Sequence, residues 1–336
     1  MNPFNYHRPT TVGEAVRLGS RSGARYIAGG TNLVDLMKEN VERPAQLIDI
    51  SKLPLGTIEE LDGALRLGAL VPNADTAYDE RVAARYPLLS SAILAGASPQ
   101  LRNAATNGGN LNQRTRCYYF YDTETACNKR EPGSGCGAIG GVNRIHAILG
   151  ASDQCIATHP SDMCVALATL DARVEVAGAQ GTRTIAFADY HRLPGDDPSR
   201  DNTLELGELV TAIILPAEDF SQHYTYLKLR DRLSYAFALV SVAVVMRFDG
   251  PEIVEARIAL GGVAHKPWRV PEVERLLVGR EPGEAAFAKL ADSLLEDAAG
   301  EGANDFKIPL ARRAIIRALT QAAAGTPQSQ TDKRVA

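Results

Sequence analysis

The stretch Tyr26-Ile27-Ala28-Gly29-Gly30-Thr31-Asn32-Leu33 decides how the fold begins. A short apolar run, typical of a strand, leads directly into two glycines, and helical patterning follows over 33–38. Because a helix is expected at 11–20 and a strand at 47–50, the first fifty residues predict a βαβ-like unit. Glycine at such a turn lets a phosphate approach outward-facing backbone amides, although paired glycines also occur in ordinary turns.

A second glycine turn, Asn107-Gly108-Gly109-Asn110, follows Arg102-Asn103. Two interpretations of these distant turns are open. Either they hold opposite sides of one pyrophosphate, or they are unrelated loops. A third stretch, residues 135–140, matches GxGxxG by letter. That motif must follow a buried strand and open a helix, and the polar residues before it exclude such a strand.

The remaining pattern predicts an α+β protein with boundaries near residues 55 and 220. Strands are expected at 65–69, 174–176, 182–185, 209–215, 224–230, 237–248 and 255–260. Helices are expected at 75–97 with a break at Pro87, from 162 to 170, at 283–298 and at 309–324. The polar tail after Gly325 is expected to be disordered.

Four of the five cysteines, Cys117, Cys127, Cys136 and Cys155, fall in one glycine-rich polar segment. Four thiolates are the full ligand set of an iron–sulfur cluster or of a closed zinc site. No CxxC pair is present, so the common zinc-ribbon signature is missing. The residues themselves leave iron–sulfur and zinc as alternatives. We expect the segment to be too poor in hydrophobic residues to fold alone, and metal ligation to stabilise it.

Other candidate ligands have simpler interpretations. Cys164 lies in an apolar helical run and is expected to be a core residue. His146 and His159 are more typical of hydrogen-bonding residues than of ligands. The polar loop 230–235 ends in Tyr235, which either covers a flat cofactor ring or forms the tip of a surface hairpin.

Composition limits the classes of partner. The formal net charge is −4 and the basic residues are dispersed, which argues against nucleic acid. No apolar run approaches the roughly 20 residues of a membrane-spanning helix. The first residues lack the features of a signal peptide, so we expect a cytoplasmic protein, or one exported with a signal-bearing partner.

Together these segments resemble the FAD-binding medium subunit of the xanthine dehydrogenase (molybdenum hydroxylase) family over nearly the whole chain. The likeness runs from Phe4-Asn5-Tyr6, through both glycine turns, to the stretch at 261–269. Most members lack the cysteine segment, but a minority carry such an insertion with an extra [4Fe–4S] cluster. The stretches 114–117 (RTRC) and 127–130 (CNKR) look similar to flavin subunits of bacterial three-subunit aldehyde oxidoreductases.

The resemblance implies a two-part FAD-binding domain of the vanillyl-alcohol-oxidase-like (PCMH) type, followed by a C-terminal α+β domain with an antiparallel sheet and helices. The expected parts are 1–55, 56–220 with the insertion at about 111–158, 221–325, and a tail at 326–336. The implied FAD contacts are Ala28, Gly29, Gly30, Thr31, Asn32, Leu33, Arg102, Thr106, Gly108, Gly109, Asn110, Asp162, Lys228, Ser234 and Tyr235. The implied [4Fe–4S] ligands are Cys117, Cys127, Cys136 and Cys155.

In this family a molybdenum-cofactor subunit, a subunit with two [2Fe–2S] clusters and the flavin subunit act together. The resemblance therefore implies that this chain passes electrons from its partners' clusters, through FAD, to an external acceptor, with an aldehyde oxidised on a partner. No catalytic residue for substrate oxidation is expected here. The alternatives are a flavin subunit like that of 4-hydroxybenzoyl-CoA reductase, a self-sufficient flavin oxidase and a zinc-stabilised scaffold.

Overall fold

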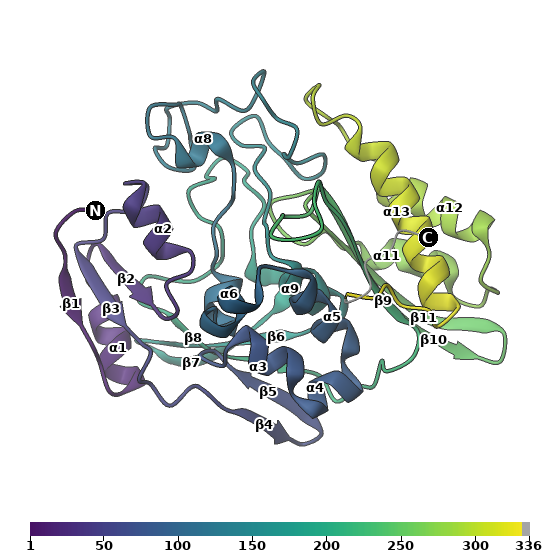
Figure 1. The fold of residues 1–336 in the computed structure, drawn as a ribbon, viewed down its shortest axis with the longest axis horizontal. Helices are drawn as coiled ribbons and strands as arrows, with labels where there is room; N and C mark the ends of the chain where they lie inside the picture. Colours follow the sequence, from purple (N-terminus) through teal and green to yellow (C-terminus); the bar gives the residue numbers. More distant parts are fainter. Residues whose placement is uncertain (331–336) are drawn as a thin grey trace.

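The structure, a computed structural model, describes residues 1–330 and contains three separate sheets (Figure 1). One sheet is parallel and two are antiparallel, with helices between and around them. This arrangement confirms the α+β prediction. The boundaries expected near residues 55 and 220 both fall in loops.

The N-terminal unit is a parallel sheet in the order β1-β3-β2. Its elements are β1 (Asn5–His7), α1 (Val12–Gly19), β2 (Ala24–Ile27), α2 (Leu33–Lys38) and β3 (Gln46–Asp49). Parallel neighbours need crossover connections, which α1 and α2 supply. The hydroxyl of Thr11 accepts a hydrogen bond from the Glu14 amide at 3.2 Å and caps α1. The predicted βαβ unit is confirmed.

The second unit is built on an antiparallel sheet in the order β4-β5-β8-β6-β7. Its strands are β4 (Ile58–Leu61), β5 (Ala64–Gly68), β6 (Arg173–Gly178), β7 (Gly181–Ala186) and β8 (Leu209–Leu215). Its helices are α3 (Asn73–Tyr78), α4 (Glu80–Arg85), α5 (Pro87–Ala95), α6 (Pro99–Ala104), α7 (Asn107–Leu111), α9 (Asp162–Thr169) and α10 (Phe187–Tyr190).

The helical stretch expected at 75–97 is three helices, with one more break than Pro87 provides. Asp79 is extended, and its carboxylate accepts hydrogen bonds from the amides of Arg81 and Val82 to cap α4. Side chains of α5 and α9 pack with those of β5, β6 and β8 in the largest hydrophobic core.

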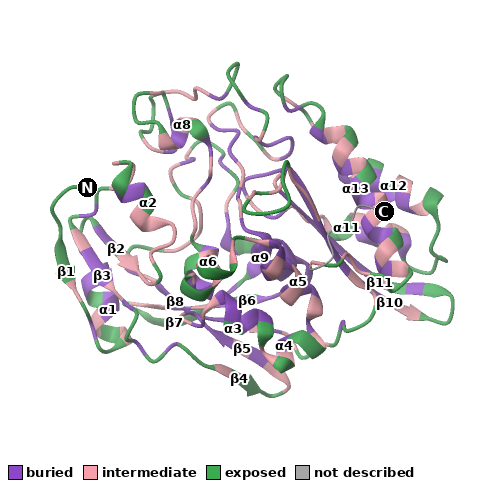
Figure 2. Ribbon diagram, viewed as in Figure 1, coloured by how far each residue is buried: buried purple, intermediate pink, exposed green. Residues whose placement is uncertain are grey.

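The C-terminal unit is an antiparallel sheet in the order β11-β10-β9. Its elements are β9 (Tyr224–Leu229), β10 (Val240–Asp249), β11 (Glu252–Gly261), α11 (Pro271–Glu274), η1 (Arg275–Leu277), α12 (Glu284–Leu294) and α13 (Lys307–Ala323). Helix α13 packs against β9 and β10, and α9 also contacts β10 and β11. Because helices cover both faces, residues 240–246 of β10 are all buried (Figure 2).

The insertion projects between α2 and α13 and carries the short helix α8 (Tyr118–Tyr121) (Figure 1). It has a hydrophobic cluster of its own, in which Phe120 is 0% exposed and Ile156 is 1% exposed. Leu36 of α2 belongs to the same cluster. The expectation that this segment lacks hydrophobic residues is therefore wrong, because a few large apolar side chains converge from distant positions in the loop.

The first residues of the C-terminal tail are held against β9. The Gln328 amide donates to Thr225 Oγ1 at 2.9 Å, and Gln330 Nε2 donates to the Tyr226 carbonyl at 3.0 Å. This part of the tail is ordered, contrary to expectation, and residues 331–336 lie outside the described residues.

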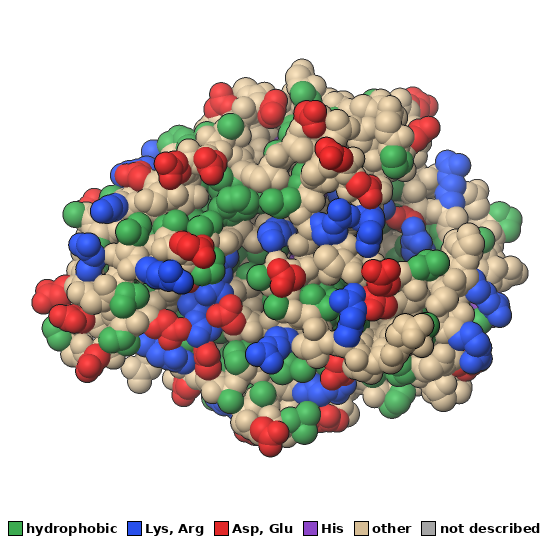
Figure 3. Space-filling model, turned by 180° about the vertical axis from the view of Figure 1, so that it is seen from behind, with side chains coloured by type: hydrophobic (Ala, Val, Ile, Leu, Met, Phe, Trp, Pro, Cys, Tyr) green, Lys and Arg blue, Asp and Glu red, His purple; other side chains and the backbone are tan. Residues whose placement is uncertain are grey.

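The face seen in Figure 3 carries acidic, basic and hydrophobic side chains interspersed over its surface. None of the helices within residues 1–330 has the length and apolar character that a membrane crossing requires.

Candidate functional site

The first glycine turn packs directly on residues 104–105, which lead into the second turn. A Cβ added at Gly29 would overlap the carbonyl oxygen of Ala104, at the end of α6, so only glycine permits this approach. Gly30 has φ of +72°, a conformation that side chains disfavour, and a Cβ there would also lie 3.0 Å from Val34 Cγ2. The backbone of the first turn is thus fitted closely to the segment that leads into the second.

A cavity of about 570 Å³ lies where the three units meet, and a smaller one of about 110 Å³ shares Thr31, Asn32 and Gly109 with it. The volume is typical of a small-molecule or cofactor site. Of the expected FAD contacts, the larger cavity is lined by Thr31, Asn32, Arg102, Gly109, Asn110, Asp162 and Tyr235. The smaller one alone is lined by Ala28, Gly29, Gly30, Leu33 and Thr106.

Among the residues that line the larger cavity, three buried nitrogens have no hydrogen-bond partner in the described structure: Asn32 Nδ2, Arg116 Nε and His159 Nε2. The Asn32 amide is oriented because its Oδ1 accepts from the Arg114 backbone N at 2.9 Å. Unpaired buried donors are costly, and a phosphate oxygen would satisfy them. Sequence reasoning missed Arg116, whose only signal was its position between the second turn and Cys117.

Asn110, by contrast, already uses its side chain within the protein. Its Oδ1 accepts from Ser161 Oγ at 2.6 Å and Gln113 Nε2 at 2.7 Å, and its Nδ2 donates to Asn73 Oδ1 at 2.7 Å. This network joins the second turn to the start of α9 and to α3. The structure therefore gives Asn110 a positioning role at the cavity wall.

Three of the expected FAD contacts, Gly108, Lys228 and Ser234, line neither cavity in the described structure. Gly108 packs against Ala69, where an added Cβ would lie 3.1 Å from the Ala69 Cβ. Lys228 Nζ lies 2.7 Å from Asp162 Oδ2 and is covered by it. Lys228 thus contacts the cavity only through Asp162.

Asp162 accepts a second hydrogen bond from Tyr226 Oη at 2.6 Å. Burial raises the pKa of Tyr226 well above its ordinary value, so the phenol stays protonated and donates. With Lys228 and Tyr226 on one side, the Asp162 carboxylate is fixed at the wall of the cavity, which it lines.

The loop between β9 and β10 forms one rim of the cavity. Tyr235 has φ of +50° and is 59% exposed, a conformation rarely adopted by aromatic residues. Arg232 donates to the carbonyls of Ser234 at 3.1 Å and Tyr235 at 2.7 Å. Arg116 lies over the Phe237 ring at 5.0 Å, so this loop contacts the insertion.

The four insertion cysteines gather around one apolar cluster. Cys127 and Cys136 pair as an isolated antiparallel bridge, and Cys117 and Cys155 pack in the same cluster. Burial, with a smaller contribution from neighbouring thiols, raises the pKa of Cys117 to about 12 and that of Cys155 to about 11. A bound cation would offset this cost and release protons.

The thiols of this set are spread more widely than one zinc ion requires. Within residues 1–330, the cysteines of the insertion do not form a group whose ligand atoms all lie within 4.8 Å of one another. A tetrahedral zinc with bonds of about 2.3 Å holds its sulfurs about 3.8 Å apart. Cys164 lies elsewhere, in the core of the second unit, as expected for a core residue.

One compact group of possible ligands does occur, formed by the buried side chains of His159, Cys164 and His191. The Ser161 amide donates to His159 Nδ1 at 3.4 Å, and His191 Nε2 lies 2.9 Å from the Leu111 carbonyl. These contacts put the His159 proton on Nε2 and leave a lone pair on His191 Nδ1. These two ring nitrogens have no hydrogen-bond partner among the described residues, although the ring centroids lie 4.3 Å apart.

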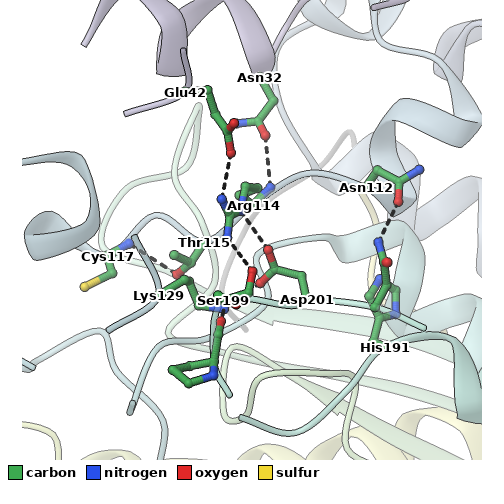
Figure 4. Close-up of polar contacts among 12 residues, drawn as sticks. Asn32, Glu42, Asn112, Arg114, Thr115, Cys117, Lys129, His191, Ser199 and Asp201 are labelled. Atoms are coloured by element: carbon green, nitrogen blue, oxygen red, sulfur yellow. Dashed lines mark hydrogen bonds and ion pairs between the residues drawn. The ribbon is translucent and has the colours of Figure 1, made fainter. Parts of the chain in front are cut away.

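A buried ion network fixes the insertion to the rest of the chain (Figure 4). Arg114 lies between Glu42 and Asp201, at 2.7 Å from each carboxylate, and Lys129 Nζ lies 2.6 Å from Asp201. Burial opposes the charged form of Asp201, but Lys129 and Arg114 hold its pKa well below the ordinary value. The network connects the first turn, through Asn32, to the start of the cysteine loop at Arg114 and to its interior at Lys129.

We expect Asp201→Asn to destabilise the subunit by about 3 kcal/mol, because Lys129, only 1% exposed, keeps its charge without a counterion. In the wild type this contribution is present above the ordinary Asp pKa of 3.8 and is lost as the pH falls below it. Thermal unfolding from pH 3 to 7 should therefore show a stability loss in acid that the variant lacks.

The matched control for this prediction is Asp153→Asn, an exposed aspartate in the same insertion. It should leave the unfolding temperature unchanged. Equal stability of the two variants would contradict the role given to Asp201.

Comparison with known families identifies both parts of the chain. Residues 2–218 match the FAD binding domain in molybdopterin dehydrogenase, and residues 222–322 match the CO dehydrogenase flavoprotein C-terminal domain. The first of these covers more than half of the chain and contains both glycine turns.

Individual relatives match over their full length. The chain is 50% identical over 327 residues to the aldehyde oxidoreductase FAD-binding subunit PaoB of Escherichia coli K12, covering 96% of this chain and 99% of that protein. It is 28% identical over 330 residues to the carbon monoxide dehydrogenase medium chain of Afipia carboxidovorans, covering 95% and 98%. A solved structure, the reconstituted CO dehydrogenase from Oligotropha carboxidovorans, matches with a TM-score of 0.76 at 26% identity, covering 96% of this chain and 99% of that one. The chain is therefore an FAD-binding medium subunit of the molybdenum hydroxylase family, and thus a subunit of an oxidoreductase of the xanthine dehydrogenase type.

Proposed function

We propose that this chain is the electron-transfer flavin subunit of a molybdenum-dependent aldehyde oxidoreductase complex. The observation that carries the proposal is the 50% identity, over nearly the whole of both chains, to a protein named as an aldehyde oxidoreductase FAD-binding subunit. The partners are a molybdenum-cofactor subunit and a subunit with [2Fe–2S] clusters. The aldehyde is oxidised on a partner, and electrons leave through this chain to an external acceptor.

The cavity residues fit an FAD site. The two turns, with Asn32 Nδ2 and Arg116 Nε, would hold the pyrophosphate, because they offer backbone amides and unpaired donors at one cavity. Tyr235 and Phe237 supply aromatic surface at its rim. When bound, FAD supplies a carrier that accepts single electrons from iron–sulfur clusters and holds two.

The insertion fits a [4Fe–4S] cluster held by Cys117, Cys127, Cys136 and Cys155. Support comes from four thiols in one apolar cluster, spread more widely than a zinc ion requires. The cluster, when bound, supplies a one-electron centre. The chain's own side chains would exclude water from the cluster, since three of the four cysteines are less than 9% exposed and Phe120 is fully buried beside them.

A hetero-oligomer containing this chain and both partners is the expected result of native mass spectrometry on the co-expressed subunits. The proposal assigns no site of substrate oxidation to this chain. The flavin subunit must therefore present a docking face for the partner on which the oxidation takes place. A free monomer of this chain with full aldehyde-oxidising activity would contradict the proposed function.

A further inference from the structure

The ring of His146 contacts one of the insertion cysteines. Its Nε2 lies 3.0 Å from Cys117 Sγ, and the residue is 0% exposed. The other ring nitrogen, Nδ1, is buried and has no hydrogen-bond partner among the described residues. The contact with sulfur is the one hydrogen bond of full geometry that the described residues give the ring, although the Asn143 backbone also interacts with it.

The position of the ring proton follows from these two contacts. A proton on Nδ1 would direct the Nε2 lone pair at the sulfur 3.0 Å away, which a metal-ligating thiolate would repel. A proton on Nε2 instead donates to the sulfur. When Cys117 is a thiolate, this N–H···S hydrogen bond is charge-assisted.

The backbone at His146 is fixed by the C-terminal unit. Lys307 Nζ donates to the His146 carbonyl at 2.7 Å and to the Gly262 carbonyl at 2.6 Å. Asn304 Nδ2 donates to the Ala147 carbonyl at 2.8 Å. Lys307 and Asn304 are both 0% exposed, so the ring is positioned by a buried scaffold and not by a mobile loop.

We propose that His146 is a positioning residue of the iron–sulfur site, whose Nε2–H donates to the Cys117 thiolate and raises the reduction potential of the cluster. The inference rests on the [4Fe–4S] cluster of the proposed function. Reduction adds one electron and makes the sulfur ligands more negative, so the hydrogen bond stabilises the reduced cluster more than the oxidised one.

The test is a redox titration of the purified complex, followed by electron paramagnetic resonance, for the wild type, His146→Leu and His146→Gln. The leucine variant should shift the one-electron equilibrium about tenfold toward the oxidised cluster, a potential lower by about 59 mV. The glutamine variant keeps an amide N–H donor and should recover most of the wild-type potential. Equal potentials in all three proteins, with full iron content, would overturn the role of His146 and leave the proposed cluster standing.

A second measurement needs no variant and covers the case in which His146→Leu fails to assemble. Pulsed electron paramagnetic resonance of the reduced wild-type complex, labelled with ¹⁵N-histidine, should show a weak nitrogen coupling transmitted through the hydrogen bond. A strong coupling would show that a histidine ligates the cluster directly, and the absence of a coupling would show that no such hydrogen bond exists. Either result overturns the proposal. A wild-type complex with no iron beyond that of the partner's [2Fe–2S] clusters would instead overturn the cluster itself.

Discussion

Serine at any one of Cys117, Cys127, Cys136 and Cys155 is expected to lower the iron content of the purified complex by about four atoms per copy of this chain, leaving the iron of the partner's [2Fe–2S] clusters. Hydroxyl oxygen is a poor ligand for a cluster that selects soft thiolates. Loss of the cluster also leaves the three remaining thiols and a new hydroxyl without their metal partner in the apolar cluster around Phe120, which should destabilise the insertion. Iron analysis and the resonance signal of the reduced protein measure the effect.

Cys164→Ser is the matched control, since it makes the same chemical change at a cysteine that is 0% exposed in another core. Iron should be unchanged, with a stability cost of about 1–3 kcal/mol for the buried hydroxyl. Full iron content in one of the four insertion variants would contradict the assignment of the replaced cysteine as a ligand. If wild-type protein prepared without air holds stoichiometric zinc and no iron at this site, the assignment of the ligands is right and the assignment of the metal is wrong.

The double variant Gly30→Val, Gly109→Val is expected to lose nearly all bound FAD. At Gly30 the φ of +72° and the nearby Val34 oppose any side chain, so the first turn must move. Gly109 lines both cavities, and its Cβ position has open space apart from Thr106 Oγ1 at 3.0 Å, so valine there would fill the cofactor's side of the second turn. Flavin absorbance released by denaturation, divided by protein concentration, gives the occupancy.

The control for this pair is Gly56→Val, at an exposed glycine with nothing within 4 Å of its Cβ position. It should keep full flavin. A double variant that folds and retains full FAD would show that the cofactor does not lie against these turns.

Local pattern was enough to place most elements of the fold. The apolar run of β8 and the helical spacing of α2 were located with the bounds that the structure has, because each is short and regular, β8 ends before Pro216 and α2 follows the first glycine turn. The edge strands β1 and β4 were missed. Both are short and largely exposed, so they lack the buried alternation that predicts a strand.

The site was only partly accessible to the same reasoning. The glycine turns could be found locally, but the direct contact of Gly29 with Ala104 depends on tertiary packing. The Arg114 network joins residues from three distant segments, and each charge alone resembles an ordinary surface residue. The apolar cluster of the insertion was missed because Phe120 and Ile156 have no shared period. Such convergence is set by the folded loop and not by spacing.

The clamp that Lys307 and Asn304 place on residues 145–147 has a consequence for biosynthesis. At a ribosomal rate of about 5–20 residues per second, helix α13 emerges roughly 8–30 s after Cys155. During that interval the loop has all its thiols but not the side chains that fix its backbone. Iron delivery to a finished chain, after release from the ribosome, is therefore the order of events that this architecture favours, and a nascent chain would be the form most vulnerable to oxidants.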